Sequence, residues 1–261
     1  MATSLKSRPP GGVLYLYGIT AEGQGAIAGV AGVDGSAPID ALPCSGLVCW
    51  TSSVDHAQFD ENLPSNMENL EWLAQVSVRH QQAVAAIARS HDILPARFGT
   101  VFRGAASLAA DVRKRKPQLI RDLKRIAGCE EWGVKVFRLQ QQAPAATRAK
   151  SGRDYLRAKA AVLRTQPSAQ ADPEVQEFLR ALQTLAVETA AGPGAVSRGQ
   201  RGLLWQGSLL LERSRRPRLQ QLLARYSRQW HGQRSIEASG PWPPYSFVSH
   251  SKGRQTEAGR S

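Results

Sequence analysis

The apolar residues of the chain fall into short runs, which predict strands, and into longer stretches of helical spacing, which predict helices. Trp132, Val134 and Val136 alternate with polar residues, which makes their run the clearest half-buried strand. Two short strands are expected around 30–33 and 39–42, inside a stretch rich in Gly and Ala. Compact β-branched and aromatic runs predict the main strands, at residues 13–19, 47–51, 131–139 and 203–211.

Two helices are expected between these strands in the first half of the chain. Ser65 or Asn66 is expected to cap the first helix. His80 lies on its apolar face and is interpreted as a hydrogen-bonded core residue, with a ligand role as the alternative. The second helix covers 108–126, and Pro117 inside it is expected to kink the helix or to start another one. The apolar face of the first helix consists of Trp72, Val76, His80, Val84 and Ile87.

The second half contains a linker-like stretch and three expected helices. Residues 140–150 read QQQAPAATRAK, a composition typical of a linker. A capping box at Ser151 predicts a helix that continues to about residue 163. Asp172 is expected to cap the next helix, and Gly192-Pro193 to end it. The last helix places its apolar side inward, with Leu219, Leu222, Leu223, Tyr226 and Trp230.

Strands and helices are mixed in both halves without a regular βαβ repeat. This arrangement predicts an α+β protein of two domains, each of the split βαβ type. The predicted organisation is a flexible tail at 1–12, an N-terminal α+β domain at 13–140, a linker at 141–150, a basic C-terminal α+β domain at 151–248 and a disordered tail at 249–261.

Positive charge is concentrated in the second half. The chain has 34 Lys and Arg against 21 Asp and Glu, a formal net charge of +13, yet residues 1–130 hold 13 basic and 12 acidic side chains. Residues 198–234 hold nine arginines and a single acid. Such a cluster suits phosphate binding, so a basic nucleic-acid-binding module is one hypothesis for function. The run at 113–116 is interpreted as a solvated helix face. Candidate partner-binding arginines of the basic half are Arg215, Arg218, Arg225 and Arg228.

The sequence carries no recognisable catalytic or metal-binding motif. It has no G-x-S-x-G, H-E-x-x-H, Walker A or dinucleotide-binding pattern, and its five histidines are scattered singly. The three cysteines lack the spacing of a zinc site and are expected to be reduced thiols. No run of apolar residues is long enough to span a bilayer, and the first dozen residues lack the apolar core of a secretory signal. We therefore expect no enzyme activity, no cofactor and no metal; a hydrolase whose site assembles only in the fold stays an alternative.

Six strings in a fixed order resemble one protein family. They are YLYGI at 15–19, HQ at 80–81, LPARFGTVF at 94–102, GCEEWGVKV at 128–136, GRDYL at 152–156 and GPWPPYSF at 240–247. Together they resemble the gas vesicle proteins of the GvpF/GvpL family, over roughly residues 13 to 248. The strings LPARFGTVF, EWGVKV and GPWPPYSF are specific only in combination.

The resemblance implies two α+β domains, of which the C-terminal one is a modified ferredoxin-like fold. It also implies an accessory or minor structural protein of gas vesicle formation, located in the gas vesicle or the cytoplasm. Such a protein is not an enzyme and holds no cofactor. It is expected to bind the shell protein GvpA and other accessory Gvp proteins.

Two of the strings supply further candidate residues for partner binding. We interpret the segment LPARFGTVF at 94–102 as structural, with Phe98 in the core. The alternative is that Arg97 and Phe98 anchor a partner. The run GPWPPYSF is stiff because three of its residues are prolines. We interpret it as an aromatic strap that closes the edge of the C-terminal sheet; the alternative is a docking strip that uses Trp242 and Tyr245.

Overall fold

The computed structural model describes residues 12–23, 25–139, 172–191 and 202–249, which form two compact units. The first unit consists of Met1–Cys129 and Trp242–Ser261, and the second of Glu130–Pro241. This division differs from the predicted one because the strand expected at the end of the first domain pairs with strands of the second half. The predicted linker at 141–150 and the helix expected up to residue 163 lie outside the described residues.

A six-stranded sheet forms the centre of the first unit. Its order is β2-β3-β4-β1-β5, and β6 also pairs with β1. The long strands β1 and β4 are antiparallel. Val13, Tyr15 and Tyr17 of β1 belong to one core cluster, and all residues from 15 to 20 are buried, so both faces of this strand are covered. The bounds are β1 Gly12–Thr20, β2 Ala26–Ala31, β3 Pro38–Cys44, β4 Leu47–Asp55, β5 Ile93–Pro95 and β6 Val101–Phe102. The two short strands expected in the stretch rich in Gly and Ala are thus present, whereas β5 has no counterpart among the predicted strands.

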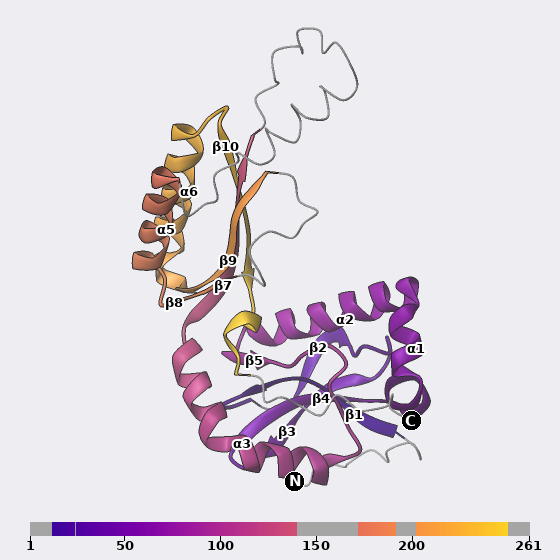
Figure 1. Cartoon of the computed structure of the whole chain (residues 1–261). Helices are drawn as coiled ribbons and strands as arrows, with labels where there is room; N and C mark the ends of the chain where they lie inside the picture. Colours follow the sequence, from indigo (N-terminus) through magenta and orange to yellow (C-terminus); the bar gives the residue numbers. More distant parts are fainter. Residues whose placement is uncertain (1–11, 24, 140–171, 192–201, 250–261) are drawn as a thin grey trace, which may run out of the picture. The chain divides into compact units, whose positions relative to one another are not determined.

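Two long helices cover opposite faces of this sheet (Figure 1). They are α2, Leu70–Ala88, and α3, Ala105–Ile126; the short η1, Ala57–Glu61, and α1, Leu63–Glu68, precede α2. The predicted cap is wrong: Asn69 caps α2, and its side chain accepts the N–H groups of Glu71 and Trp72, both at 3.1 Å. Ser65 and Asn66 instead lie within α1, a separate turn of helix that the apolar pattern did not reveal.

Pro117 lies inside α3 without ending it. The helix continues as one element through the proline, and Figure 1 shows that it changes direction part-way along its length. This agrees with the predicted kink and not with a second helix. Apolar residues on both sides of the bend stay buried, among them Val112 and Leu119, so the helix follows the sheet through the change of direction.

The second unit has a four-stranded sheet in the order β10-β7-β9-β8. Two helices, α5 and α6, cover one face of this sheet (Figure 1). Its core contains Trp132, Val134 and Val136 of β7, as the alternation predicted. The bounds are β7 Cys129–Arg138, α5 Pro173–Leu185, β8 Glu188–Ala191, β9 Leu203–Glu212, η3 Arg213–Arg215, α6 Arg216–Gln229 and β10 Arg234–Trp242.

The helix that begins after Asp172 is shorter than predicted. Asp172 does cap α5, where its side chain accepts the Val175 N–H at 3.4 Å. The helix ends at Leu185, however, and the residues expected to complete it form β8, paired antiparallel with β9. Cross-strand hydrogen bonding therefore prevails over the local helical composition of these residues. The inward side predicted for α6 is confirmed, because Leu219, Tyr226 and Trp230 are buried.

Candidate functional site

Four segments that are far apart in the sequence meet around His80 in the first unit. Tyr15 of β1 lies 3.0 Å from the Nδ1 atom of His80, and Tyr245 lies 3.2 Å from its Nε2 atom, both through the phenol oxygen. Phe98 packs its ring edge-on against the imidazole at 5.8 Å between ring centres. Tyr245 belongs to η4, Tyr245–Phe247, at the C-terminal end of the described chain. The segments are therefore brought together by folding and not by sequence proximity.

Both ring nitrogens of His80 are hydrogen-bonded to phenol oxygens. The phenol oxygen of Tyr15 accepts the N–H of Gly99 at 3.0 Å and is also hydrogen-bonded to Nδ1 of His80. The tautomer of His80 decides which of the two phenols donates to the imidazole and which accepts from it. Gly99 has a φ of 76°, a left-handed conformation that glycine adopts without steric cost. The tight turn at Gly99 is thus what presents its N–H to Tyr15.

The cluster is uncharged at neutral pH. Burial lowers the pKa of His80 to about 4, an effect that a backbone hydrogen bond with Ala96 partly opposes. Burial likewise raises the pKa of Tyr15 and Tyr245 above the usual phenol range. A neutral imidazole between two protonated phenols has neither an activated nucleophile nor a charged base beside it. The arrangement holds segments together, as the structural interpretation of His80 predicted.

The C-terminal segment belongs to the first unit beyond β10. Phe247 is buried there; its carbonyl oxygen accepts a hydrogen bond from Arg125, and Ser249 donates its N–H to Asp122 at 3.2 Å. The predicted strap along the edge of the C-terminal sheet is therefore wrong after residue 242. Of the residues 240–247, only 240–242 lie in the edge strand β10. Tyr245 is instead hydrogen-bonded to His80 and the carbonyl oxygen of Phe247 to Arg125, both in the first unit.

The candidate residues of the two strings separate into a half-buried pair and an exposed pair. Phe98 and Tyr245 contact His80, so they are part of the packed cluster. Arg97 is exposed one position before Phe98, and Trp242 keeps 49% of its surface exposed. The two exposed side chains are the ones that remain available to a partner.

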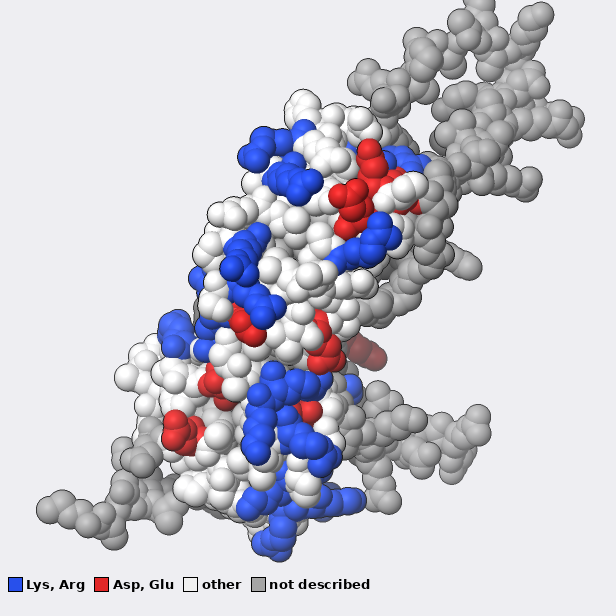
Figure 2. All heavy atoms as spheres, turned by 90° about the vertical axis from the view of Figure 1, so that its left-hand side faces the viewer, with Lys and Arg blue, Asp and Glu red and all other residues white. Residues whose placement is uncertain are grey.

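The candidate arginines of the second unit are also not equivalent. Arg215 donates to the carbonyl oxygen of Leu185 at 3.0 Å and pairs with Glu212 at 3.0 Å, so it ties η3 to the end of α5. Arg218, Arg225 and Arg228 are exposed on α6. Figure 2 shows basic side chains on this face of the second unit interspersed with acidic ones. Of the four candidate arginines, the three that are exposed therefore lie on one helix, α6.

Two arginines outside the predicted set form ion pairs with buried carboxylates. Arg216 contacts both carboxylate oxygens of Glu130, at 2.9 and 2.5 Å, and Trp132 donates its indole N–H to the same group at 2.8 Å. Burial alone would raise the pKa of Glu130, but the hydrogen bonds and charge of Arg216 outweigh it and the pKa is lowered. Arg234 pairs with Asp172 at 2.8 Å in the same way. A carboxylate directly before the alternating apolar residues of β7 was the sequence signal for the first pair.

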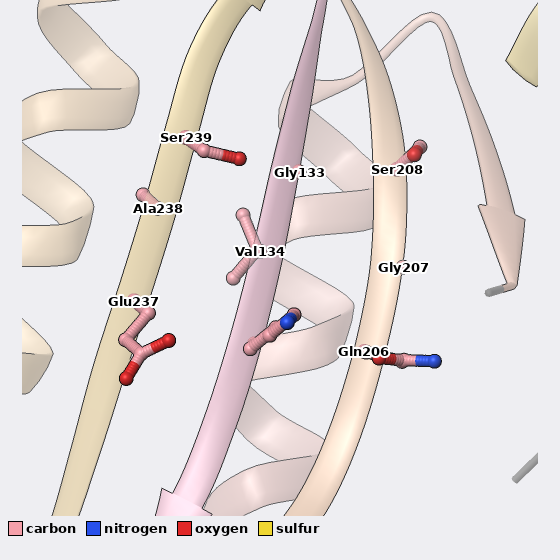
Figure 3. A pocket seen from close by; sticks show the side chains of 9 residues that line it. Gly133, Val134, Gln206, Gly207, Ser208, Glu237, Ala238 and Ser239 are labelled. Carbon is pink, nitrogen blue, oxygen red and sulfur yellow. The ribbon is translucent and has the colours of Figure 1, made fainter. Parts of the chain in front are cut away.

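An open hollow lies on the sheet of the second unit, over β7, β9 and β10. It has a volume of about 390 Å³, and Gly133 and Gly207 lie along it where side chains would otherwise stand (Figure 3). Its lining includes one base and one acid, Lys135 and Glu237, but no His or Cys. The complete lining consists of Gly133, Val134, Lys135, Gln206, Gly207, Ser208, Glu237, Ala238 and Ser239. Across the described residues, no group of His, Cys, Asp and Glu is placed to hold a metal ion.

Known proteins are similar to nearly the whole described chain. The family model described as gas vesicle synthesis protein GvpL/GvpF matches residues 13–249. The chain belongs to the GvpL/GvpF family of gas vesicle proteins. Gas vesicle protein L of Streptomyces sp. (strain CB03234) is 32% identical over 252 residues, which cover 90% of this chain and 92% of that protein.

Solved structures of the family share the fold. The crystal structure of GvpF from Anabaena sp. PCC7120 superposes with a TM-score of 0.67 at 17% identity, covering 92% of this chain and 97% of that one. GvpF from Microcystis aeruginosa gives a TM-score of 0.63 at 17% identity, covering 91% and 99%. The match extends over the His80 cluster and the C-terminal segment, since residues 13–249 include both. No described helix of this GvpL/GvpF member is long and apolar enough to cross a membrane.

Proposed function

We propose that the protein is a non-enzymatic accessory or minor structural protein of gas vesicle formation, which binds the shell protein GvpA and other Gvp proteins during assembly. Membership of the GvpL/GvpF family over residues 13–249 carries this proposal. The uncharged His80 cluster supports the non-enzymatic part of the proposal, because it holds segments together and places no charged base or activated nucleophile beside the imidazole. The proposed location is the gas vesicle or the cytoplasm around it.

The second unit is proposed to be a modified ferredoxin-like domain. Its described elements follow the order strand, helix, strand, strand, helix, strand. Its sheet order, β10-β7-β9-β8, puts the first and third of these strands in the centre. Both features are those of a split βαβ fold. An experimental structure with another strand order would contradict this assignment.

The exposed face of α6 is proposed as the surface that receives a Gvp partner. Arg218, Arg225 and Arg228 are exposed there, whereas Arg215 and Arg216 are used inside the unit. Exposed arginines that are not held by internal ion pairs are suited to steering an acidic partner into place. Arg97 and Trp242 are the corresponding candidates in the first unit.

Co-purification tests the proposal. Tagged protein is co-expressed with GvpA and, separately, with each accessory Gvp protein, and gas vesicles are counted in a strain that lacks the gene. We expect capture of at least one Gvp protein and loss of normal vesicles. Capture of none of them, together with normal vesicles in the deletion strain, would refute the proposal.

A charge-reversal pair tests the α6 surface separately. The triple variant Arg218→Glu, Arg225→Glu and Arg228→Glu is compared with a control that reverses Arg113, Lys114 and Lys116 on α3, which changes the net charge equally. We expect only the α6 variant to lose the partner. Equal binding by both variants would leave the family role intact but remove α6 as the surface.

The nucleic-acid-binding module remains the rival hypothesis. Three of the nine arginines in 198–234, namely Arg215, Arg216 and Arg234, are held by carboxylates of their own unit, which lowers the charge available to phosphates. Nucleic-acid binding weakens steeply with salt, with a slope near one per phosphate contact. Filter binding at two salt concentrations measures this slope, and strong binding with a steep slope would favour the rival.

A further inference from the structure

The outer face of α2 is unusually apolar for an exposed helix surface. Leu70 keeps 79% of its surface exposed and Val78 55%, and Met67 of the adjoining α1 keeps 45%. These are three of the six large hydrophobic residues that are exposed in the described part of the chain. Exposed apolar residues that gather on one element, and are not scattered singly, mark interaction surfaces.

The helical geometry aligns these residues into one stripe. Successive residues of a helix turn by about 100°, so five exposed residues of α2 fall within a sector of about 80°. They are Leu70, Ala74, Val78, Gln81 and Ala85, all of which are exposed. The two alanines leave the backbone accessible, which permits a second helix to approach to about 8 Å between axes.

The charges on this face lie only at its two ends. Glu71 is in the first turn of α2 and Arg89 is its C-cap residue, and both are exposed. They are 18 residues apart, about five turns or 27 Å, so they point in the same direction from the axis. Arg79, the other charged residue of the helix, turns to the sheet side and donates to the carbonyl oxygen of Val33 at 3.3 Å. The stripe is thus neutral between a negative and a positive end.

We propose that this face is a self-association surface, on which two copies of the chain pack their α2 helices antiparallel. A two-fold axis near the middle of the stripe, between Val78 and Gln81, places Glu71 of each copy opposite Arg89 of the other. The Val78 side chains meet near the axis, and the glutamines supply hydrogen-bonding groups around them.

A second copy is the occupant that this charge pattern fits. A two-fold interface is isologous, so every contact occurs twice and a face must complement itself. An antiparallel pair gives two opposite-charge contacts, whereas a parallel pair sets Glu71 against Glu71 and Arg89 against Arg89. The face is confined to about one helix length, so the interface is small and the dimer is expected in the weak class.

Sedimentation velocity of the full-length protein over a range of concentrations tests the proposal. We expect a monomer–dimer equilibrium, with a dissociation constant that Val78→Lys raises at least about tenfold because it places two unpaired ammonium groups in the interface. Val187→Lys is the matched control, since Val187 is a similarly exposed valine of the second unit, and it should leave the equilibrium unchanged. Circular dichroism checks that both variants fold.

A charge-reversal cycle tests the antiparallel arrangement. Glu71→Arg and Arg89→Glu, each alone, set like charges together and should weaken the dimer several-fold; the double variant restores the pairing and should recover most of the loss. A chain that stays monomeric at about 500 µM overturns the proposal, since even weak specific dimers form below that concentration. A dimer that Val78→Lys does not affect also overturns it, and a double variant as weak as the singles overturns the antiparallel packing.

Discussion

Replacing His80 with glutamine should make the stability of the protein less sensitive to acid. His80 is buried, with 1% of its surface exposed, and its ring is held between Tyr15 and Tyr245. Burial lowers its pKa from 6.5 to about 4 in the folded protein. Between these two values the unfolded chain binds a proton that the folded chain does not, so acid favours unfolding. Glutamine keeps an acceptor and a donor but does not titrate.

The magnitude follows from the two pKa values. Stability from the neutral imidazole is complete above pH 6.5 and is lost progressively as the pH falls towards 4. Between about pH 7.5 and about pH 5, His80 alone should lower the free energy of unfolding by about 2 kcal/mol. His80→Gln should itself cost about 1 to 2 kcal/mol at neutral pH through poorer hydrogen-bond geometry, a cost that does not depend on pH.

Urea unfolding followed by circular dichroism, at several values between about pH 7.5 and about pH 5, measures the effect. The unchanged protein should lose about 2 kcal/mol more than His80→Gln over that range, because the other titrating groups are common to both and cancel. His231→Gln, at an exposed histidine of the second unit, serves as the matched control and should follow the unchanged protein. Parallel curves for His80→Gln and the unchanged protein would refute the view that His80 is buried in its neutral form.

Three further substitutions test the packing. Arg216→Met should lower the free energy of unfolding by about 2 kcal/mol at neutral pH, which is less than for a fully buried pair because the guanidinium is partly exposed. This loss should shrink in acid as Glu130 becomes protonated, and urea unfolding at two pH values measures both effects. Asn69→Ala should lower the unfolding free energy by about 1 kcal/mol through loss of the α2 cap, seen as a lower thermal midpoint. Gly202→Ala should destabilise the protein more than Gly232→Ala does. Both glycines have φ near 80°, but only a Cβ at residue 202 would lie 2.5 Å from the Arg138 carbonyl oxygen. Equal thermal midpoints of the two variants would contradict this reasoning.

The main strands could be predicted because their signal is local. The runs at 13–19, 47–51 and 203–211 lie within β1, β4 and β9, because β-branched and aromatic residues favour strands that pack against a core. The short strands β5 and β8 were missed for the opposite reason. Ile93–Pro95 and Glu188–Ala191 have little strand character of their own and are strands because β1 and β9 offer them an edge to pair with.

The candidate site was predicted only in part. His80 was correctly interpreted as a hydrogen-bonded core residue from its place on an apolar helix face. Its partner Tyr245 is 165 residues away, and no pattern along the chain relates two positions at that distance. The same limit applies to Arg216, which pairs with Glu130 across 86 residues and was counted with the free positive charge.

The sequence by itself determined the α+β composition, the apolar faces of the helices and the excess of positive charge, because each depends on residues within a few positions of one another. The family resemblance came from strings such as 94–102 and 240–247, and the strings alone did not show which residues they contact in the fold. Only the tertiary structure decided which charges are consumed in ion pairs, that β7 belongs to the second unit, and that the Tyr245 segment packs beside His80. These outcomes depend on contacts between distant segments, whose energies are set by burial and pairing after the chain has folded.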